Sequence, residues 1–158
     1  MAILKLTRLM KKLFIPFALI VLAFASCTDE KAQKEAEEKT KEKTYLNEVI
    51  KIHDEVMGKE DRLMRNKMKI DTILIPDTLN AKYTVVEKAT LSALRSKLLA
   101  ADEAMSKWMQ DFDAELKGKT HEEKIKYYIE QKKAVTQIDS IFTAVIEGSD
   151  KYLKEIKK

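Results

Sequence analysis

The feature that most constrains this chain is an apolar repeat at steps of three and four residues near its middle. A repeat of this period places its members along one face of an α-helix. Thr84 and Glu87 precede the repeat with the spacing of a capping box, and Gly118 follows it as a left-handed cap residue. We therefore expect a helix from about Thr84 to Gly118, with an apolar face made by Leu91, Leu94, Leu98, Ala101, Met105, Trp108 and Phe112.

Two further segments have helical periodicity. The first spans Tyr45 to Lys69, with Glu60 as a polar interruption, and the other opens with a second capping box at Thr120 and Glu123. The expected face of the first is Leu46, Val49, His53, Val56 and Leu63, widened by Ile50, Met57, Met64 and Met68. The expected face of the other is Ile125, Tyr128, Val135, Ile138, Phe142, Val145, Tyr152 and Ile156.

Residues 70–84 break this pattern and predict a loop. Pro76 cannot continue a helix, and we expect Ile73 and Ile75 to cover the end of the helices from this loop. Three helices with one apolar face each bury those faces best against one another. The fold class is therefore all-α, an antiparallel three-helix bundle over residues 45–158, with an elongated coiled-coil dimer as the alternative.

The N-terminus has the layout of a secretory signal peptide. Four basic residues lie within the first twelve, and Leu13 to Ser26 are fourteen residues without a charge. A membrane-spanning helix needs about 20 apolar residues, which makes this run too short for a transmembrane anchor. We interpret residues 1–26 as a signal peptide that is cleaved.

The cysteine that follows is the only one in the chain. The tetrapeptide "FASC", which ends at Cys27, resembles the lipobox of bacterial lipoproteins, with Phe24 in place of the usual leucine. The resemblance implies that Cys27 carries the lipid that anchors the protein to a membrane. Thr28 rather than an aspartate follows the cysteine, which favours the outer membrane of the bacterial envelope, on its periplasmic face or at the cell surface.

Residues 27–44 read as a charged tether, because residues 28–44 contain no large apolar side chain. We expect this tether to be disordered. The signal peptide holds four of the 30 basic residues and none of the 26 acidic ones, so the remaining chain carries 26 of each. This balance argues against a nucleic-acid-binding protein, which would carry an excess of basic residues.

No catalytic or nucleotide-binding motif is present in the sequence, and we expect neither enzyme activity nor a cofactor. One cluster offers an alternative function. In an antiparallel pairing, His53 and Met57 of the first helix lie near Met105 and Met109 of the second, with Trp108 between these two methionines. Imidazole and thioether groups suit soft metals such as Cu(I), although methionines in a helical stripe also serve as ordinary core. His121 is expected to be exposed and receives no role.

The segments "IHDEVMGKEDRLM" and "LLAADEAMSKWMQDF" resemble small helical bacterial lipoproteins of the type labelled "viral A-type inclusion protein". This resemblance implies coiled-coil character and no known activity. We therefore predict a membrane-anchored, non-enzymatic helical module that binds an envelope protein or another envelope component, with self-association as a further possibility. The alternative is a soft-metal-binding protein that uses the His53 and methionine cluster.

Overall fold

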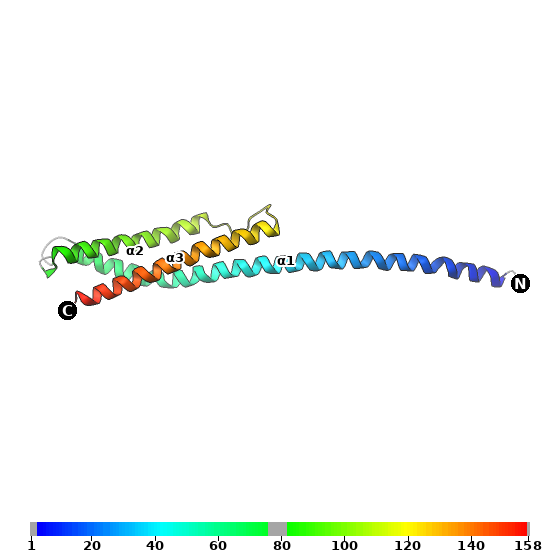
Figure 1. Ribbon diagram of the computed structural model, residues 1–158, viewed down its shortest axis with the longest axis horizontal. Helices are drawn as coiled ribbons and strands as arrows, with labels where there is room; N and C mark the ends of the chain where they lie inside the picture. Colours follow the sequence, from blue (N-terminus) through cyan, green and yellow to red (C-terminus); the bar gives the residue numbers. More distant parts are fainter. Residues whose placement is uncertain (1–2, 76–81, 158) are drawn as a thin grey trace. The chain divides into compact units, whose positions relative to one another are not determined.

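The computed structural model is all-helical, which confirms the predicted fold class (Figure 1). It describes the backbone of residues 3–75 and 82–157 and the side chains of residues 30–75 and 82–157. Three helices follow in order: α1 (Ile3–Leu74), α2 (Val85–Asp111) and α3 (His121–Glu155). The chain divides into two compact units, Met1–Lys41 and Glu42–Lys158. The second unit contains the last part of α1 together with α2 and α3.

Within the second unit the helices form an up-down-up bundle. α2 is antiparallel to both neighbours, so α1 and α3 run parallel, and contacts between their side chains fix these directions. The pairs that do so are His53–Met109 and Asp71–Arg95 for α1 with α2, Trp108–Gln131 for α2 with α3, and Glu48–Lys132 and Asn66–Ser149 for α1 with α3. Asp113, just after α2, contacts Tyr127 of α3 in the same sense.

The core is a single apolar cluster to which all three helices contribute. Its buried members on α2 are the ones that the repeat predicts, with Leu94 and Phe112 partly buried at its margin. On α3 the core also takes in Ile146 and Leu153, which the predicted face did not include. The buried apolar residues are Val49, Val56, Leu63, Ile70, Leu91, Leu98, Ala101, Met105, Trp108, Tyr128, Val135, Ile138, Phe142, Ile146 and Leu153.

Both predicted capping boxes are present. The Thr84 hydroxyl accepts the N–H of Glu87, and the Glu87 carboxylate accepts the N–H of Thr84 at 2.7 Å. Thr120 and Glu123 repeat this exchange at the start of α3. The N–H groups of the two threonines hold the pKa values of both glutamates below the ordinary value. Each box satisfies amides that the first turn of a helix leaves without partners.

The predicted end of α2 was wrong. The helix stops at Asp111, and Phe112 is already extended. The cause is the turn that follows, in which the Asp113 carboxylate accepts the N–H groups of Glu115 and Leu116. These two bonds hold the pKa of Asp113 below its ordinary value. Gly118 is left-handed, with a φ of 78°, but it serves the loop to α3 and not the end of α2.

The predicted start of the loop after α1 was also wrong. α1 continues to Leu74, and Ile70 is fully buried in the core. The helix ends where it does because Pro76 disfavours helical geometry at the residue before it. Ile73 packs against the core as expected, but Ile75 is exposed. Residues 76–81 of the predicted loop lie outside the described residues.

The apolar seam of α1 confirms Val49, Val56 and Leu63 of the predicted stripe, but the positions between them are shifted by one residue, from Leu46, His53 and Glu60 to Tyr45, Ile52 and Lys59. The residues that face the core alternate at steps of four and three, and two of the positions are polar. The seam consists of Tyr45, Val49, Ile52, Val56, Lys59, Leu63, Asn66, Ile70 and Ile73. His53 and Glu60 therefore lie one position to the side of the seam, at the edge of the interface, and not at its centre.

The predicted tether is helical in the structure, which corrects the expectation of disorder. α1 includes all of residues 28–44, and the described side chains of the first unit are almost all exposed. The segment contains no glycine or proline, and lysines pair with glutamates one turn earlier, as in Lys39–Glu35 and Lys41–Glu37. Such pairs stabilise exposed helices by about 0.2–0.5 kcal/mol each.

Candidate functional site

The predicted histidine–methionine cluster is the first candidate site. His53 on α1 keeps 23% of its side chain exposed, and its Nδ1 lies 2.9 Å from Oδ1 of Asp54. Its other nitrogen, Nε2, lies 3.4 Å from Sδ of Met109 on α2. Met109 is itself 41% exposed. The two side chains thus meet across the α1–α2 interface at a point that solvent can reach.

Trp108 covers this contact from the core side. Its ring lies 5.8 Å from the His53 ring and is tilted by 31°. The indole N–H donates to Oε1 of Gln131 on α3 at 2.9 Å, and the ring stacks on Phe112 at 4.8 Å. These two contacts fix the position of the indole ring, and His53 packs against that ring on its core side.

Met57 and Met105 occupy the next helical turn on each side. Met57 lies four residues after His53, and Met105 lies four residues before Met109. Because α1 and α2 are antiparallel and His53 faces Met109, the same register sets Met57 opposite Met105. Met105 is buried and Met57 partly buried. The four predicted residues therefore lie on facing turns of two helices.

A polar connection between α1 and α3, absent from our sequence predictions, is a second candidate site. The buried Asn66 amide donates to the buried Ser149 hydroxyl at 2.9 Å and to Oδ1 of Asp150 at 2.7 Å. Lys59, one heptad earlier in the same seam, reaches Asp139 at 2.6 Å and Thr143 at 3.0 Å. The signal that could have found these residues is the four–three spacing of α1 itself, which places Lys59 and Asn66 on core positions.

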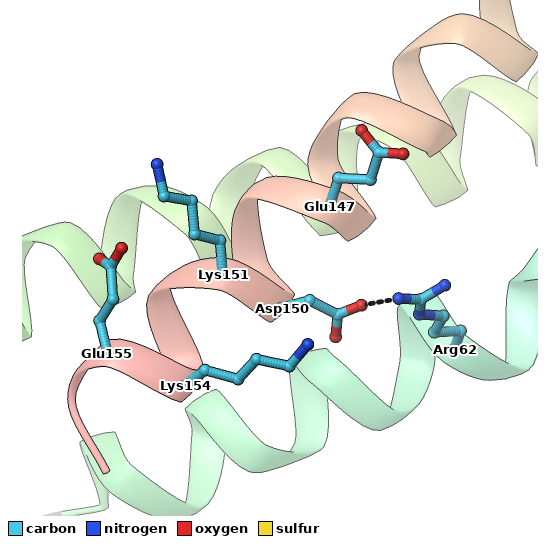
Figure 2. A pocket seen from close by; sticks show the side chains of 6 residues that line it. All are labelled: Arg62, Glu147, Asp150, Lys151, Lys154 and Glu155. Atoms are coloured by element: carbon cyan, nitrogen blue, oxygen red, sulfur yellow. Dashed lines mark hydrogen bonds and ion pairs between the residues drawn. The ribbon is translucent and has the colours of Figure 1, made fainter. Parts of the chain in front are cut away.

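Next to this connection the surface is hollowed between α1 and the last turns of α3. Figure 2 shows that Asp150 points toward Arg62 of α1, with which it forms an ion pair. Burial raises the pKa of Asp150, but hydrogen bonds from Asn66 and Arg62 lower it by more, so the pKa lies below its ordinary value. The residues that line the hollow are Arg62, Glu147, Asp150, Lys151, Lys154 and Glu155. Charges of both signs thus line this charged hollow.

Asp71 joins α1 to α2 by ion pairs at the same end of the bundle. It pairs with Lys67 at 2.8 Å and with Arg95 of α2. The hydrogen bond from Lys67, together with that from Arg95, holds the pKa of Asp71 below its ordinary value. We refer to Arg62, Asn66, Asp71, Ser149 and Asp150 as the polar end of the bundle.

The opposite end is built from aromatic rings, and we refer to Trp108, Phe112, Tyr127 and Tyr128 as the aromatic end. The Tyr127 hydroxyl accepts the N–H of Asp113, and the Tyr128 hydroxyl donates to the Ala114 carbonyl at 3.0 Å. Burial, and then the nearby Glu42 carboxylate, raise the pKa of Tyr128. His121 pairs with Glu42 and is only partly exposed, so the expectation of a freely exposed histidine was wrong.

Apolar side chains are exposed where α1 passes into α2. Val85 and Val86, the first two residues of α2, are 84% and 74% exposed. Ile75 and Met68 of α1 are also exposed. We refer to these four residues as the apolar tip. It lies at the same end of the bundle as the charged hollow.

The predicted signal peptide and the side chain of Cys27 lie outside the described side chains. Within the described residues no helix offers an apolar stretch long enough to cross a membrane. The described residues also contain no group of three or more histidine, cysteine, aspartate or glutamate side chains placed to hold a metal ion. Methionine thioethers are ligands of a different class.

The chain matches no protein-family model, no curated protein and no solved structure. The resemblance to helical lipoproteins labelled "viral A-type inclusion protein" therefore stays a prediction.

Proposed function

We propose that this protein is a lipid-anchored component of the bacterial envelope whose helical bundle acts as a non-enzymatic protein-interaction module. Support for the anchor comes from the sequence, in which a basic segment, a short apolar run and "FASC" follow one another in the order of a lipoprotein signal. Thr28 after the cysteine favours the outer membrane. Two or more acyl chains on Cys27 hold a protein stably on a membrane.

The observation that carries the interaction function is the apolar tip. Two adjacent valines at the start of α2 are more than 70% exposed, although the helix has a core face available for apolar residues. The charged hollow between α1 and α3 lies at the same end of the bundle. An apolar centre with a charged rim is the usual anatomy of a protein-binding surface. The partner that fits is a protein with an apolar patch flanked by both signs of charge.

The carboxylates whose pKa values are shifted have structural roles in the bundle. Asp71 and Asp150, whose pKa values are shifted, each join two helices through ion pairs. Glu87, Glu123 and Asp113 hold helix starts and a turn. All five carboxylates thus have partners that stabilise the fold.

The anchor is tested by labelling cells with a palmitate analogue and fractionating their membranes. We expect the label on the wild-type chain and in the outer-membrane fraction. The Cys27→Ala chain should lose both. A Cys27→Ala chain that stays membrane-bound to the same extent would refute the lipid anchor.

The interaction surface is tested by placing a photocrosslinking amino acid at Val86 in the intact envelope. The matched control carries the same amino acid at Lys107, which is exposed on α2 away from the tip. We expect a discrete crosslinked band from position 86 alone, and its loss when Val85 and Ile75 are changed to aspartate. Equal bands from both positions, or none from position 86, would contradict a partner site at the tip.

A further inference from the structure

We propose that His53 and Met109 form a binding site for a soft monovalent metal ion, Cu(I), between α1 and α2, with Met57 and Met105 as the source of further thioether ligands. This goes beyond the proposed interaction function and does not depend on the lipid anchor. The observation that carries the proposal is the contact of 3.4 Å between Nε2 of His53 and Sδ of Met109.

With a neutral His53 ring, no hydrogen atom lies between Nε2 of His53 and Sδ of Met109. A neutral imidazole has one N–H and one lone pair. Asp54 lies at hydrogen-bond distance from Nδ1, and a carboxylate only accepts, so it takes the N–H of the ring. Nε2 then presents its lone pair to Met109, whose thioether also only accepts. Two acceptors that face each other are joined by a cation between them, either a second proton on the ring or a metal ion.

The separation of the two atoms fits a shared metal ion. In zinc sites the metal lies about 2.0 Å from imidazole nitrogen and about 2.3 Å from thiolate sulfur, and we take these lengths as the scale for a shared ion. With Nε2 and Sδ 3.4 Å apart, those bond lengths close a triangle with an angle of about 105° at the metal, near the tetrahedral value. The ion would occupy a position that neither helix has to move to create.

The surroundings also favour a metal ligand. A carboxylate at the far nitrogen fixes the tautomer and the ring orientation of a ligating histidine, and Asp54 occupies that position beside His53. Trp108 holds the imidazole plane from the core side. Met109 is 41% exposed, so an ion can enter from solvent.

The identity of the metal follows from the donors. Thioether sulfur is a soft ligand that selects Cu(I), whereas hard cations take oxygen and Zn(II) prefers thiolate and imidazole. Met57 and Met105, one turn along α1 and α2 from this contact, would add only thioethers to the set. A site of one imidazole and several thioethers therefore discriminates Cu(I) from Zn(II).

The chain carries its own reporter for this site. Trp108 is the only tryptophan, and its ring lies 5.8 Å from that of His53. We would titrate the full chain in detergent with Cu(I) under anaerobic conditions, buffered by a competing chelator, and follow tryptophan fluorescence. All proteins would carry Cys27→Ser to remove the thiol, and Zn(II) would serve as the control metal.

We expect Cu(I) to quench the fluorescence to saturation at one equivalent and Zn(II) to leave it unchanged. His53→Gln and Met109→Leu should each weaken binding at least tenfold, since even the loss of an outer-shell partner costs about 10–100-fold. Met68→Leu, an exposed thioether elsewhere on α1, is the matched control and should bind as the parent does. Met109→Leu keeps the size of an exposed side chain and should fold, which circular dichroism verifies.

Two results would overturn the proposal. The first is fluorescence that Cu(I) does not change at concentrations that saturate the chelator. The second is quenching that persists in Met109→Leu and His53→Gln with unchanged affinity, which would place the ion elsewhere. The contact between His53 and Met109 would then be a hydrogen bond of the protonated ring.

Discussion

At the aromatic end of the bundle the helices meet through stacked rings, whereas at the polar end they are joined by an amide, a hydroxyl and ion pairs. Trp108, Phe112 and Tyr127 stack in sequence at centroid distances of 4.8 and 6.1 Å. Asn66 instead bridges α1 to two residues of α3. The comparison shows two ways to join amphipathic helices: one depends on apolar area, and the other depends on complete hydrogen bonding.

The largest expected effect is at the aromatic end. Trp108→Ala removes a buried ring, its stacking on Phe112 and its hydrogen bond to Gln131. We expect the free energy of unfolding to fall by about 3–5 kcal/mol. Urea unfolding followed by circular dichroism measures the change. A loss no greater than that of Asn66→Ala would show that the rings contribute no more than the polar contacts.

Asn66→Ala should come next. The change leaves the Ser149 hydroxyl and the Asp150 carboxylate without their buried donor. We expect a loss of about 1–3 kcal/mol, the cost of an unsatisfied buried polar group. The same unfolding experiment measures it, and Asn47→Ala, at an exposed position of α1, is the control. A stable Asn66→Ala protein would mean that water replaces the amide.

The capping boxes give a matched pair with one member at each end. Thr84→Ala and Thr120→Ala should each cost about 1 kcal/mol, because each removes the hydroxyl that accepts the N–H of the third helical residue. Thermal unfolding of the two variants compares them directly. Unequal costs would show that one end of the bundle frays independently of the other.

The smallest effect is the response to acid, which should be larger at the polar end, because Asp71 and Asp150 each join two helices whereas Asp113 and Glu123 at the other end hold a turn and a helix start. The pKa values of Asp71 and Asp150 lie below the ordinary value of 3.8, so their ion pairs contribute stability above that value. This stability is lost as the pH falls through the folded-state values. Asp150→Asn should lower stability at neutral pH by about 0.2–1 kcal/mol and reduce the loss on acidification.

Hydrogen exchange of the α3 amides at neutral pH and below pH 3.8 tests this prediction. Acid should weaken protection around Leu153 before it weakens protection around Tyr128. Equal loss of protection at both ends would contradict the assignment of the larger acid response to the polar end.

Local signals in the sequence predicted the starts of α2 and α3 correctly and the helix ends poorly. Thr84 and Thr120 each act through a glutamate three residues away, so the whole motif is readable. The end of α2 depends on Asp113, whose carboxylate competes for backbone amides in a turn that no periodicity reveals. Ile70 was assigned to a loop because Pro76 was read as acting further upstream than it does.

The side chains of the candidate site were likewise predicted only in part. The sequence indicated that His53, Met109 and Trp108 lie together, and the structure brings them into contact. Val49, Val56 and Leu63 were placed correctly, but the alternate positions of the α1 seam were predicted one residue too late. His53 looked like a seam residue because histidine is amphipathic, whereas Lys59 and Asn66 looked like surface residues. Only the partners on α3 explain why a lysine and an asparagine occupy core positions.

The two polar seam residues, Lys59 and Asn66, fix the register of α1 against α3, because only one alignment gives both of them their partners. A slip of one heptad, about 10 Å, would preserve most apolar contacts of a purely hydrophobic seam. Here a slip in one direction sets Lys59 against Lys132 and the Asn66 amide against the Phe142 ring. A slip in the other direction moves the Asn66 amide from Ser149 to Ile156, while Lys59 moves from Asp139 and Thr143 to Ile146 and Asp150. Each misalignment leaves a charge or amide without a partner, so the bundle is expected to assemble in a single frame.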